Sequence, residues 1–304
     1  MTTYSRRDFL RTSSAALVGS SALLSGLRLH ATPLGLPIGL QLYSVRDLLP
    51  HDFAGTLRQI ASLGYAEVEA AGYFQHSVQQ VRAALNSAGL RLPSAHYSHD
   101  DLHRDFDRIL EFNHSLGVQT LICSFPGIKN PSRLHTRSFQ TLVQSFRLED
   151  WRWNAEEFNR MGEKVKAAGM QFGYHNHTME FAPQEGVVPF QELMRLTEPS
   201  LVTFEMDCGW VKVGGGDPVY YLKRYPTRIS MLHIKDFKKS TKPVSVAAPP
   251  PPAELGRGTE DYHPIFAAAS RANIQHCFVE QEGFDMPPMQ ALKVDADYMR
   301  SFRA

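Results

Sequence analysis

Four similar joints mark the first part of the chain: S-L-G-Y at residues 62–65, S-A-G-L at 87–90, S-L-G-V at 115–118 and A-A-G-M at 167–170. In each joint, a run with apolar residues at helical spacing ends, a Gly follows, and a short apolar run begins. Gly just past a helix end readily takes the left-handed conformation that other residues resist. The four joints therefore predict one repeated helix–strand unit and not two unrelated domains.

The alternation of strand-like and helix-like runs covers residues 36–304. Strands are predicted at Ile38–Val45, Tyr65–Ala71, Leu92–Ser98, Thr120–Phe125, Met170–His177, Val202–Trp210, Ile229–Asp236 and His276–Glu282. Helices are predicted between them, the first at Asp52–Leu63 and the last at Met289–Phe302. Eight such units in about 270 residues match an α/β fold of the (β/α)8 TIM-barrel type. A doubly wound sheet would instead place a Gly-rich turn after strand one, and residues 41–44 contain no Gly.

The first 31 residues differ from the rest. S-R-R-D-F-L at residues 5–10 precedes an apolar run, Ala15–Leu27, that is shorter than the roughly 20 residues of a membrane-spanning helix. A basic stretch followed by a short apolar run is typical of an export signal, and this one resembles the twin-arginine type. The resemblance implies the twin-arginine export machinery as a partner. Residues 1–31 are therefore predicted to be an export signal, and the mature protein to be soluble and periplasmic or otherwise exported.

The composition argues against several kinds of partner. Hydrophobic residues make up 43 % and charged residues 21 %, which is a globular balance. A net charge of +1 offers no basic footprint for nucleic acid. The three Cys are widely spaced, so neither a disulfide framework nor a CxxC zinc motif is expected.

Alternate side chains of each barrel strand point inward, and several of the predicted inward positions are ionisable. They are Glu69 on strand two, His96 on strand three, His175 and His177 on strand five, Glu205 and Asp207 on strand six, His233 and Lys235 on strand seven, and Glu280 and Glu282 on strand eight. Bulky aliphatic residues normally fill these layers. Burying so many ionisable groups costs several kcal/mol each unless they are paired or bind a metal.

A divalent cation would remove much of this cost. His175, Asp207, His233 and Glu280 share the inward parity and the same height at the ends of strands five to eight. Carboxylates together with neutral imidazoles suit Mn, Zn, Co, Mg or Fe. These four residues are therefore the predicted metal ligands. His96 is equally compatible with a hydrogen-bonded core histidine, and Glu67, one layer deeper, is predicted to be structural.

The order of five motifs resembles the xylose isomerase-like TIM-barrel superfamily, often called sugar phosphate isomerases/epimerases. The motifs are G-Y-H-N-H at 173–177, F-E-M-D-C-G-W at 204–210 with G-G-G-D-P at 214–218, L-H-I-K-D at 232–236, E-L-G-R-G at 254–258 and F-V-E-Q-E at 278–282. The resemblance covers essentially the whole chain after the export signal. It implies metal ligands on strands five to eight, at the positions of His175, Asp207, His233 and Glu280.

One of these positions departs from the superfamily pattern. Many ketose epimerases have Glu on strand five where this chain has His175, and there the strand-five and strand-eight glutamates form the acid/base pair. The inosose dehydratases are more similar at this point, because they share the Y-H-x-H strand end and H-x-K-D. Both branches imply proton abstraction α to a carbonyl that a metal polarises. His175 is thus expected to be either a metal ligand or the acid/base group.

The leading interpretation is an exported, metal-dependent isomerase or epimerase acting on an unphosphorylated sugar or keto-sugar. Its expected catalytic residues are His175, Glu280 and Lys235. Substrate contacts are expected from Glu69, His96, His177, Glu180, Trp210 and Arg257. The alternative is a lyase or dehydratase on a keto-glycoside or keto-cyclitol. A DNA-repair hydrolase is disfavoured by the near-neutral charge, and a non-catalytic sugar-binding barrel is placed below the enzymes.

Overall fold

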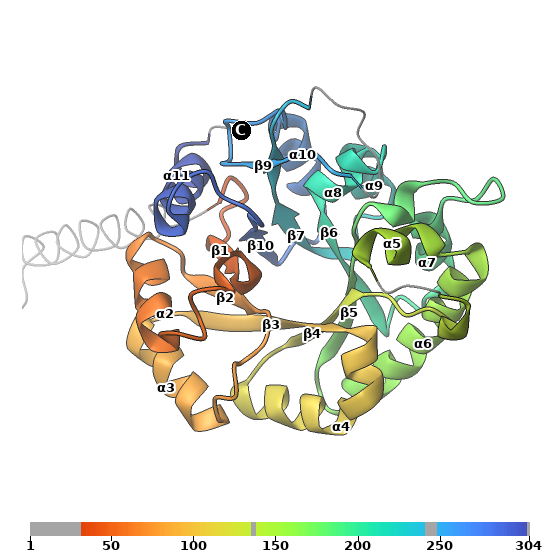
Figure 1. Cartoon of the computed structure of the whole chain (residues 1–304), viewed down its shortest axis with the longest axis horizontal. Coiled ribbons are helices and arrows are strands. Elements are labelled where there is room, and N and C mark those ends of the chain that lie inside the picture. The colour runs from red at the N-terminus through yellow and green to blue at the C-terminus, as the bar shows by residue number, and fades with distance from the viewer. Residues whose placement is uncertain (1–31, 135–137, 241–247, 303–304) are drawn as a thin grey trace, which may run out of the picture.

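The computed structural model describes residues 32–134, 138–240 and 248–302. The predicted export segment lies outside these residues. Eight parallel strands form a closed barrel in the order β1-β10-β7-β6-β5-β4-β3-β2 (Figure 1). They are β1 Gly39–Gln41, β2 Glu67–Ala70, β3 Arg91–Ser98, β4 Thr120–Phe125, β5 Gln171–His175, β6 Val202–Asp207, β7 Ile229–Ile234 and β10 His276–Val279. The predicted (β/α)8 TIM barrel is confirmed.

Helices surround the barrel, as Figure 1 shows. They are α2 Phe53–Ser62, α3 Val78–Ala88, α4 His99–Leu116, α5 Phe139–Ser145, α6 Leu148–Ala167, α7 Pro189–Leu196, α8 Cys208–Val213, α9 Pro218–Arg224, α10 His263–Ala269 and α11 Pro288–Ser301. The four glycines of the repeated joints all have positive φ, between +68° and +98°, so they stop their helices as predicted. Among the described residues, no helix is both long and apolar enough to cross a membrane.

Several predicted strands end earlier than expected, and side-chain caps explain two of these differences. The first strand stops at Gln41, whose side chain accepts a hydrogen bond from the Tyr43 N–H at 2.9 Å and starts a 3₁₀ helix over Leu42–Val45. Strand six stops at Asp207, whose Oδ1 accepts the Trp210 N–H at 2.7 Å and caps α8. An N-cap residue marks the start of a helix. Because Asp207 is the N-cap of α8, Trp210 lies on this helix and not on the strand.

One layer of the lower barrel interior is apolar. Ile122, Met231 and Phe278 are buried there and form a cluster of their own. Two glycines on the strands make room for them: a Cβ on Gly39 would clash with the Phe278 ring, and one on Gly173 with the Ile122 side chain. The barrel is therefore closed below by a packed layer, and ligands can approach only from the C-terminal ends of the strands.

The long loop after β7 folds back over those C-terminal ends. It begins with a short hairpin in which β8, Asp236–Phe237, pairs with β9, Pro252–Ala253. The Asp236 carboxylate accepts backbone N–H groups from Gly256, Gly258, Thr259 and Glu260 at 2.9–3.1 Å. This single carboxylate therefore anchors the E-L-G-R-G segment to the end of β7.

Candidate metal and substrate site

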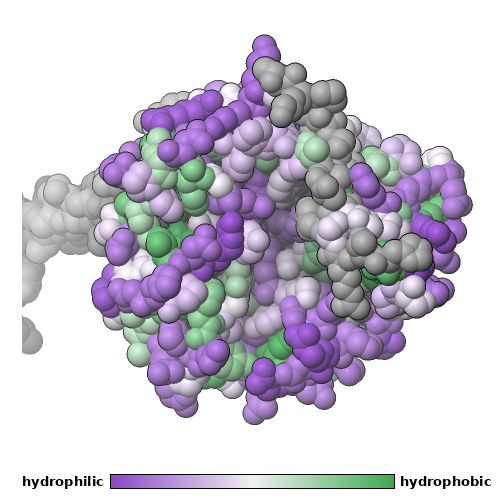
Figure 2. Space-filling view, viewed as in Figure 1, coloured by the Kyte–Doolittle hydropathy of each residue, from purple (hydrophilic) through white to green (hydrophobic). Residues whose placement is uncertain are grey.

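A cavity of about 770 Å³ opens at the C-terminal ends of the barrel strands. Figure 2 shows this face with a hollow near its centre and hydrophilic side chains around it. The inner lining includes His96, His175, His177, Trp210 and Glu280, all of which were predicted site residues. Large concave pockets at this end of a TIM barrel are the usual place for an active site.

Three imidazoles pack against one another at the floor of the cavity. The ring centroids of His175 and His233 lie 4.6 Å apart, and those of His96 and His233 are stacked at 5.4 Å. They come from β3, β5 and β7, so the inward parity of those strands brings them together. Such packing of three titratable rings needs acidic partners around it.

Two buried glutamates supply these partners from below. Glu205 Oε2 lies 2.6 Å from His96 Nε2 and 3.0 Å from His175 Nδ1. Glu69 Oε2 lies 2.7 Å from His233 Nε2 and 2.9 Å from His96 Nε2. Each imidazole thus has one nitrogen committed to a carboxylate below it. The second nitrogen of His175 (Nε2) is left for the site above, and that of His233 (Nδ1) lies 3.2 Å from Glu280 Oε2 in that site.

This arrangement is typical of metal-binding histidines, which donate the other ring N–H to a carboxylate. The upper set, formed by His175, Asp207, His233 and Glu280, offers four ligand atoms within 4.8 Å of one another, and all four residues are buried. A second overlapping set replaces Asp207 and Glu280 with His96 and Glu205. In this second set, Glu205 Oε2 already contacts all three histidines at 2.6–3.2 Å. Between the described residues of the upper set there is one such contact, from His233 Nδ1 to Glu280 Oε2 at 3.2 Å, so the upper set is the better candidate for a cation.

Unsatisfied oxygens in the cluster support the same conclusion. Within the described part of the chain, Glu69 Oε1 and Glu205 Oε1 are buried and accept no hydrogen bond. Asp207 is held in place by Asn176, whose side chain exchanges two hydrogen bonds with the Asp207 backbone at 3.1 and 3.3 Å. Its Oδ1 caps α8, and its Oδ2 lies 3.1 Å from the Lys235 ammonium. Buried polar atoms rarely lack partners, so the unpaired glutamate oxygens indicate a cluster that a cation would complete.

Lys235 is the cation nearest to the upper set. Its ammonium Nζ lies 2.9 Å from Glu280 Oε2, 3.1 Å from Asp207 Oδ2 and 2.5 Å from Glu282 Oε1. The ammonium also lies over the Trp210 ring, 4.2 Å from its centroid. Burial opposes its charge, but Asp207, Glu280 and Glu282 outweigh burial and raise the pKa of Lys235. Lys235 therefore stays protonated beside the predicted ligands.

The histidines differ in their titration. Burial opposes protonation of all of them, but Glu69 and Glu205 outweigh it at His96 and raise its pKa to about 9. Glu205 likewise raises the pKa of His233. Burial and the neighbouring His233 lower the pKa of His175, and burial and His175 lower the pKa of His177 well below its usual value. His175 and His177 are thus the neutral imidazoles of the cluster.

Two predicted substrate contacts lie away from the residues that line the cavity. Glu180 does not line the cavity, because the 3₁₀ turn Met179–Phe181 directs its buried carboxylate to the Tyr174 hydroxyl and the His177 N–H. Arg257 does not line it either: more than half of its side chain is exposed, and it pairs with Glu254 at 3.7 Å. Glu69 is buried beneath the histidines, where it contacts His96, His233 and Gln41, so its role is to position other residues.

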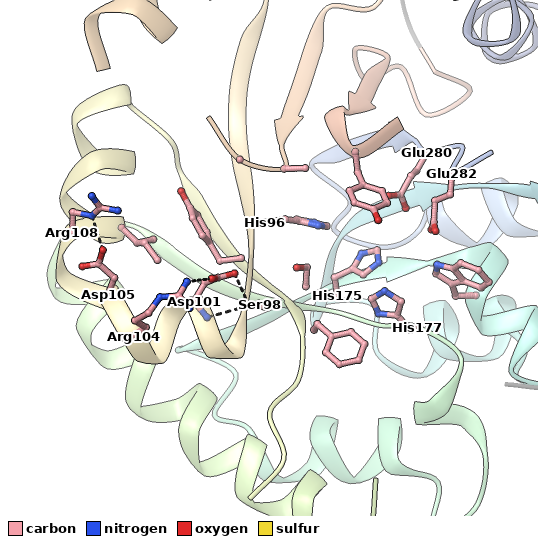
Figure 3. A pocket seen from close by; sticks show the side chains of 18 of the residues that line it. His96, Ser98, Asp101, Arg104, Asp105, Arg108, His175, His177, Glu280 and Glu282 are labelled. Carbon is pink, nitrogen blue, oxygen red and sulfur yellow. Dashed lines mark hydrogen bonds and ion pairs between the residues drawn. The ribbon is translucent and has the colours of Figure 1, made fainter. Parts of the chain in front are cut away.

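Several residues of the site were not singled out from the sequence. Glu205 was an inward position but not a predicted site residue, although its parity and its place one layer below Asp207 were visible signals. Glu282 lines the cavity and holds Lys235. The start of α4 also lines the cavity, with Ser98, Asp101, Arg104, Asp105 and Arg108 (Figure 3). No motif of the sequence pointed to that helix.

The barrel and its ring of His, Asp and Glu residues define an enzyme of the kind that uses the open end of a TIM barrel. The family model described as xylose isomerase-like TIM barrel matches residues 57–302. The chain belongs to this family, which contains sugar isomerases, epimerases and inosose dehydratases.

Individual relatives agree with this assignment. An inosose dehydratase of Clostridium botulinum is 26% identical over 265 residues, covering 79% of this chain and 85% of the relative. A sugar phosphate isomerase/epimerase structure from Parabacteroides distasonis has a TM-score of 0.68 and 27% identity, covering 86% of this chain and 96% of that one. A xylose isomerase-like TIM barrel protein from Mycobacterium smegmatis, solved in complex with magnesium, shares the fold at a TM-score of 0.63 and 16% identity, covering 88% of this chain and 97% of that one.

Proposed function

We propose that the protein is a divalent-metal-dependent isomerase or epimerase that removes a proton α to the carbonyl of an unphosphorylated sugar or keto-sugar. The observation that carries this proposal is the buried upper set of His175, Asp207, His233 and Glu280, of which His175 and Glu280 line the open cavity. Two imidazoles with two carboxylates suit Zn, Mn or Co, and Mg less well. A relative's structure with magnesium keeps Mg as a further candidate.

When bound, the cation would polarise the substrate carbonyl and so make the α proton more acidic. His175 is the proposed base for that proton. Its Nδ1 is held by Glu205 at 3.0 Å, which fixes the neutral tautomer with a lone pair on Nε2. The same geometry serves a metal ligand, so His175 fills one of these two roles. Glu280 is the second proposed acid/base group. The Lys235 ammonium, 2.9 Å from Glu280 Oε2, would stabilise negative charge on a substrate oxygen.

The test is proton exchange in D₂O, followed by NMR, on a panel of keto- and aldo-sugars with Zn or Mg added. Solvent deuterium should enter the carbon next to the carbonyl and an isomer or epimer should appear. His175→Gln should lose exchange. Retained bound metal in that variant would assign His175 as the base, and lost metal would assign it as a ligand. Absence of exchange with every sugar would contradict the proposal.

The second candidate is a lyase or dehydratase on a keto-glycoside or keto-cyclitol. The strand-five His175 favours it, since inosose dehydratases are among the curated relatives. Both reactions begin with the same proton abstraction, so exchange alone cannot separate them. An enone absorbance, or release of water or an aglycone, would identify the lyase. A product with the same mass as the substrate would identify the isomerase.

Export remains a prediction from residues 1–31. We propose that S-R-R-D-F-L directs the folded protein through the twin-arginine export machinery. Replacing Arg6 and Arg7 by Lys should retain the protein in the cytoplasmic fraction. Unchanged export of that variant, measured by cell fractionation, would contradict this prediction.

A further inference from the structure

The cavity is larger than a single sugar ring requires. Its volume of about 770 Å³ lies well within the range of roughly 300–1,000 Å³ that holds drug-sized ligands. Figure 3 shows how it is divided: His175, His177, Glu280 and Glu282 lie on one side of His96, and Ser98, Asp101, Arg104, Asp105 and Arg108 on the other. The second group, which we call the α4 rim, lies apart from every predicted metal ligand.

The α4 rim exists because β3 runs directly into α4. Ser98 is both the last residue of β3 and the N-cap of α4, and its hydroxyl exchanges hydrogen bonds with Asp101 at 2.6 and 3.1 Å. The backbone of Asp105 is not helical, with φ −146° and ψ 41°, so the first turn of α4 is bent relative to the rest. The bent turn and the residues after it line the cavity instead of packing only on the barrel.

Four charged side chains of this rim alternate in sign. Arg104 pairs with Asp101, and Arg108 Nε lies 2.6 Å from Asp105 Oδ2. These pairs are solvent-accessible, so they contribute little to stability. Each pair presents guanidinium donors next to carboxylate acceptors.

This chemistry fits neighbouring hydroxyl groups. A hydroxyl both donates and accepts, so adjacent Arg and Asp side chains can satisfy two hydroxyls of one sugar ring. The two pairs sum to zero charge, so the rim has no net attraction for a phosphate or carboxylate ligand. Tyr97, which lines the cavity next to Ser98, adds aromatic surface of the kind that packs on sugar rings.

We propose that the α4 rim is a second sugar subsite, so that the substrate is a keto-glycoside carrying a further, uncharged sugar ring. This inference rests on the proposed function, because the keto-sugar ring is taken to lie at the predicted metal ligands. The glycosidically linked ring would then extend past His96 to Arg104 and Arg108.

The test compares 3-keto-glucose with 3-keto-cellobiose as substrates for the wild type and for the double variant Arg104→Ala/Arg108→Ala. The wild type should prefer the disaccharide in kcat/KM by at least about tenfold, as expected for charge-assisted hydrogen bonds. The double variant should lower that preference about tenfold, mainly through KM. Arg195→Ala is the matched control, since it breaks an i,i+3 pair with Glu192 on α7 outside the cavity.

Equal kcat/KM for the two substrates in the wild type, or an unchanged preference in the double variant, would overturn the subsite. A binding measurement separates this failure from failure of the proposed function. If neither substrate is turned over, saturation-transfer NMR with cellobiose decides the question. Binding to the wild type that weakens in the double variant supports the subsite, and absent or equal binding contradicts it.

Discussion

Buried glutamates are paired differently at the two ends of the barrel interior, and β2 carries one at each end. Glu67, at the lower end, has both oxygens paired: Oε1 with Arg91 at 2.7 Å and Oε2 with His276 Nδ1 at 2.9 Å. Glu69, two residues further up, shares Oε2 among Gln41, His96 and His233, while its Oε1 has no partner within the described chain. At the lower end both carboxylate oxygens have a cationic or imidazole partner, and at the upper end one carboxylate oxygen has none.

The difference separates stability from function. The lower end combines the paired Glu67 with an apolar layer, and nothing there calls for a ligand. The upper end holds buried carboxylates with free oxygens beside neutral and protonated imidazoles. A chain that needed only a stable core would not retain such a cluster. Mutations at the lower end should therefore cost stability, and mutations at the upper end should cost metal binding and turnover.

The largest effect is expected from Asp207→Asn. The amide oxygen can still cap α8, so the fold should persist, but the negative ligand is lost. Lewis-acid activation supplies several kcal/mol, so kcat/KM should fall by about a thousandfold. Asp217→Asn, at the N-cap of α9, is the control and should retain activity. Near-wild-type turnover in Asp207→Asn would place the chemistry elsewhere.

At the lower end, Ile122→Ala should destabilise the protein without emptying the metal site. Ile122 is fully buried on β4, a strand that carries no predicted ligand. Removing its side chain leaves a cavity and should lower the free energy of unfolding by about 2–5 kcal/mol, compared with about 0.5–1.5 kcal/mol for Ile122→Val. Denaturant titration measures both. Loss of bound metal from folded Ile122→Ala would break the proposed separation of the two ends.

The pair on β2 sharpens the comparison further. Glu69→Gln removes a carboxylate that orients His233, and such changes weaken metal affinity by about 10–100-fold. Glu67→Gln is the matched change one layer below and should leave affinity unaltered. Metal titration by calorimetry on both variants measures the effect. Equal losses in the two would show that the affinity depends on general charge and not on the orientation of His233.

A smaller, pH-dependent effect is expected at Glu180, which lies near the upper end but forms no ion pair with the described residues. Burial raises the pKa of Glu180 to about 7. The native state therefore holds this proton more tightly than the unfolded chain, and stability falls as pH rises from about 4.5 to 7. Glu180→Gln should be more stable than wild type at pH 8, by on the order of 2 kcal/mol, and should lose this advantage near pH 4. Thermal unfolding measured across pH tests this, with the exposed Glu156→Gln as control. The same pH dependence of stability in the two variants would contradict the expectation.

Much of this layout could be predicted because strand parity and glycine stops are local features of the sequence. The period of two placed His175, Asp207 and His233 on one face, and the Gly joints set the repeat. Parity does not reveal which imidazole nitrogen faces which carboxylate, so the supporting role of Glu205 was missed.

The predicted contacts that do not line the cavity lie where the chain leaves the strands. Glu180 is turned away by a 3₁₀ turn. Arg257 lies on the segment that Asp236 anchors through backbone N–H groups, and its own side chain extends to solvent. The α4 rim depends on a bend at Asp105 that residue type alone does not signal. Loop and turn geometry is set by such tertiary contacts, which a periodic pattern cannot encode.

The most direct test of the account is the metal content of the purified, metal-reconstituted protein, measured by plasma mass spectrometry after gel filtration. We expect about one divalent cation per chain in the wild type and in Glu67→Gln, and much less in Asp207→Asn. A wild-type protein that retains no divalent cation under these conditions, or an Asp207→Asn variant that retains as much as the wild type, would contradict the assignment of the upper end of the barrel as a metal site.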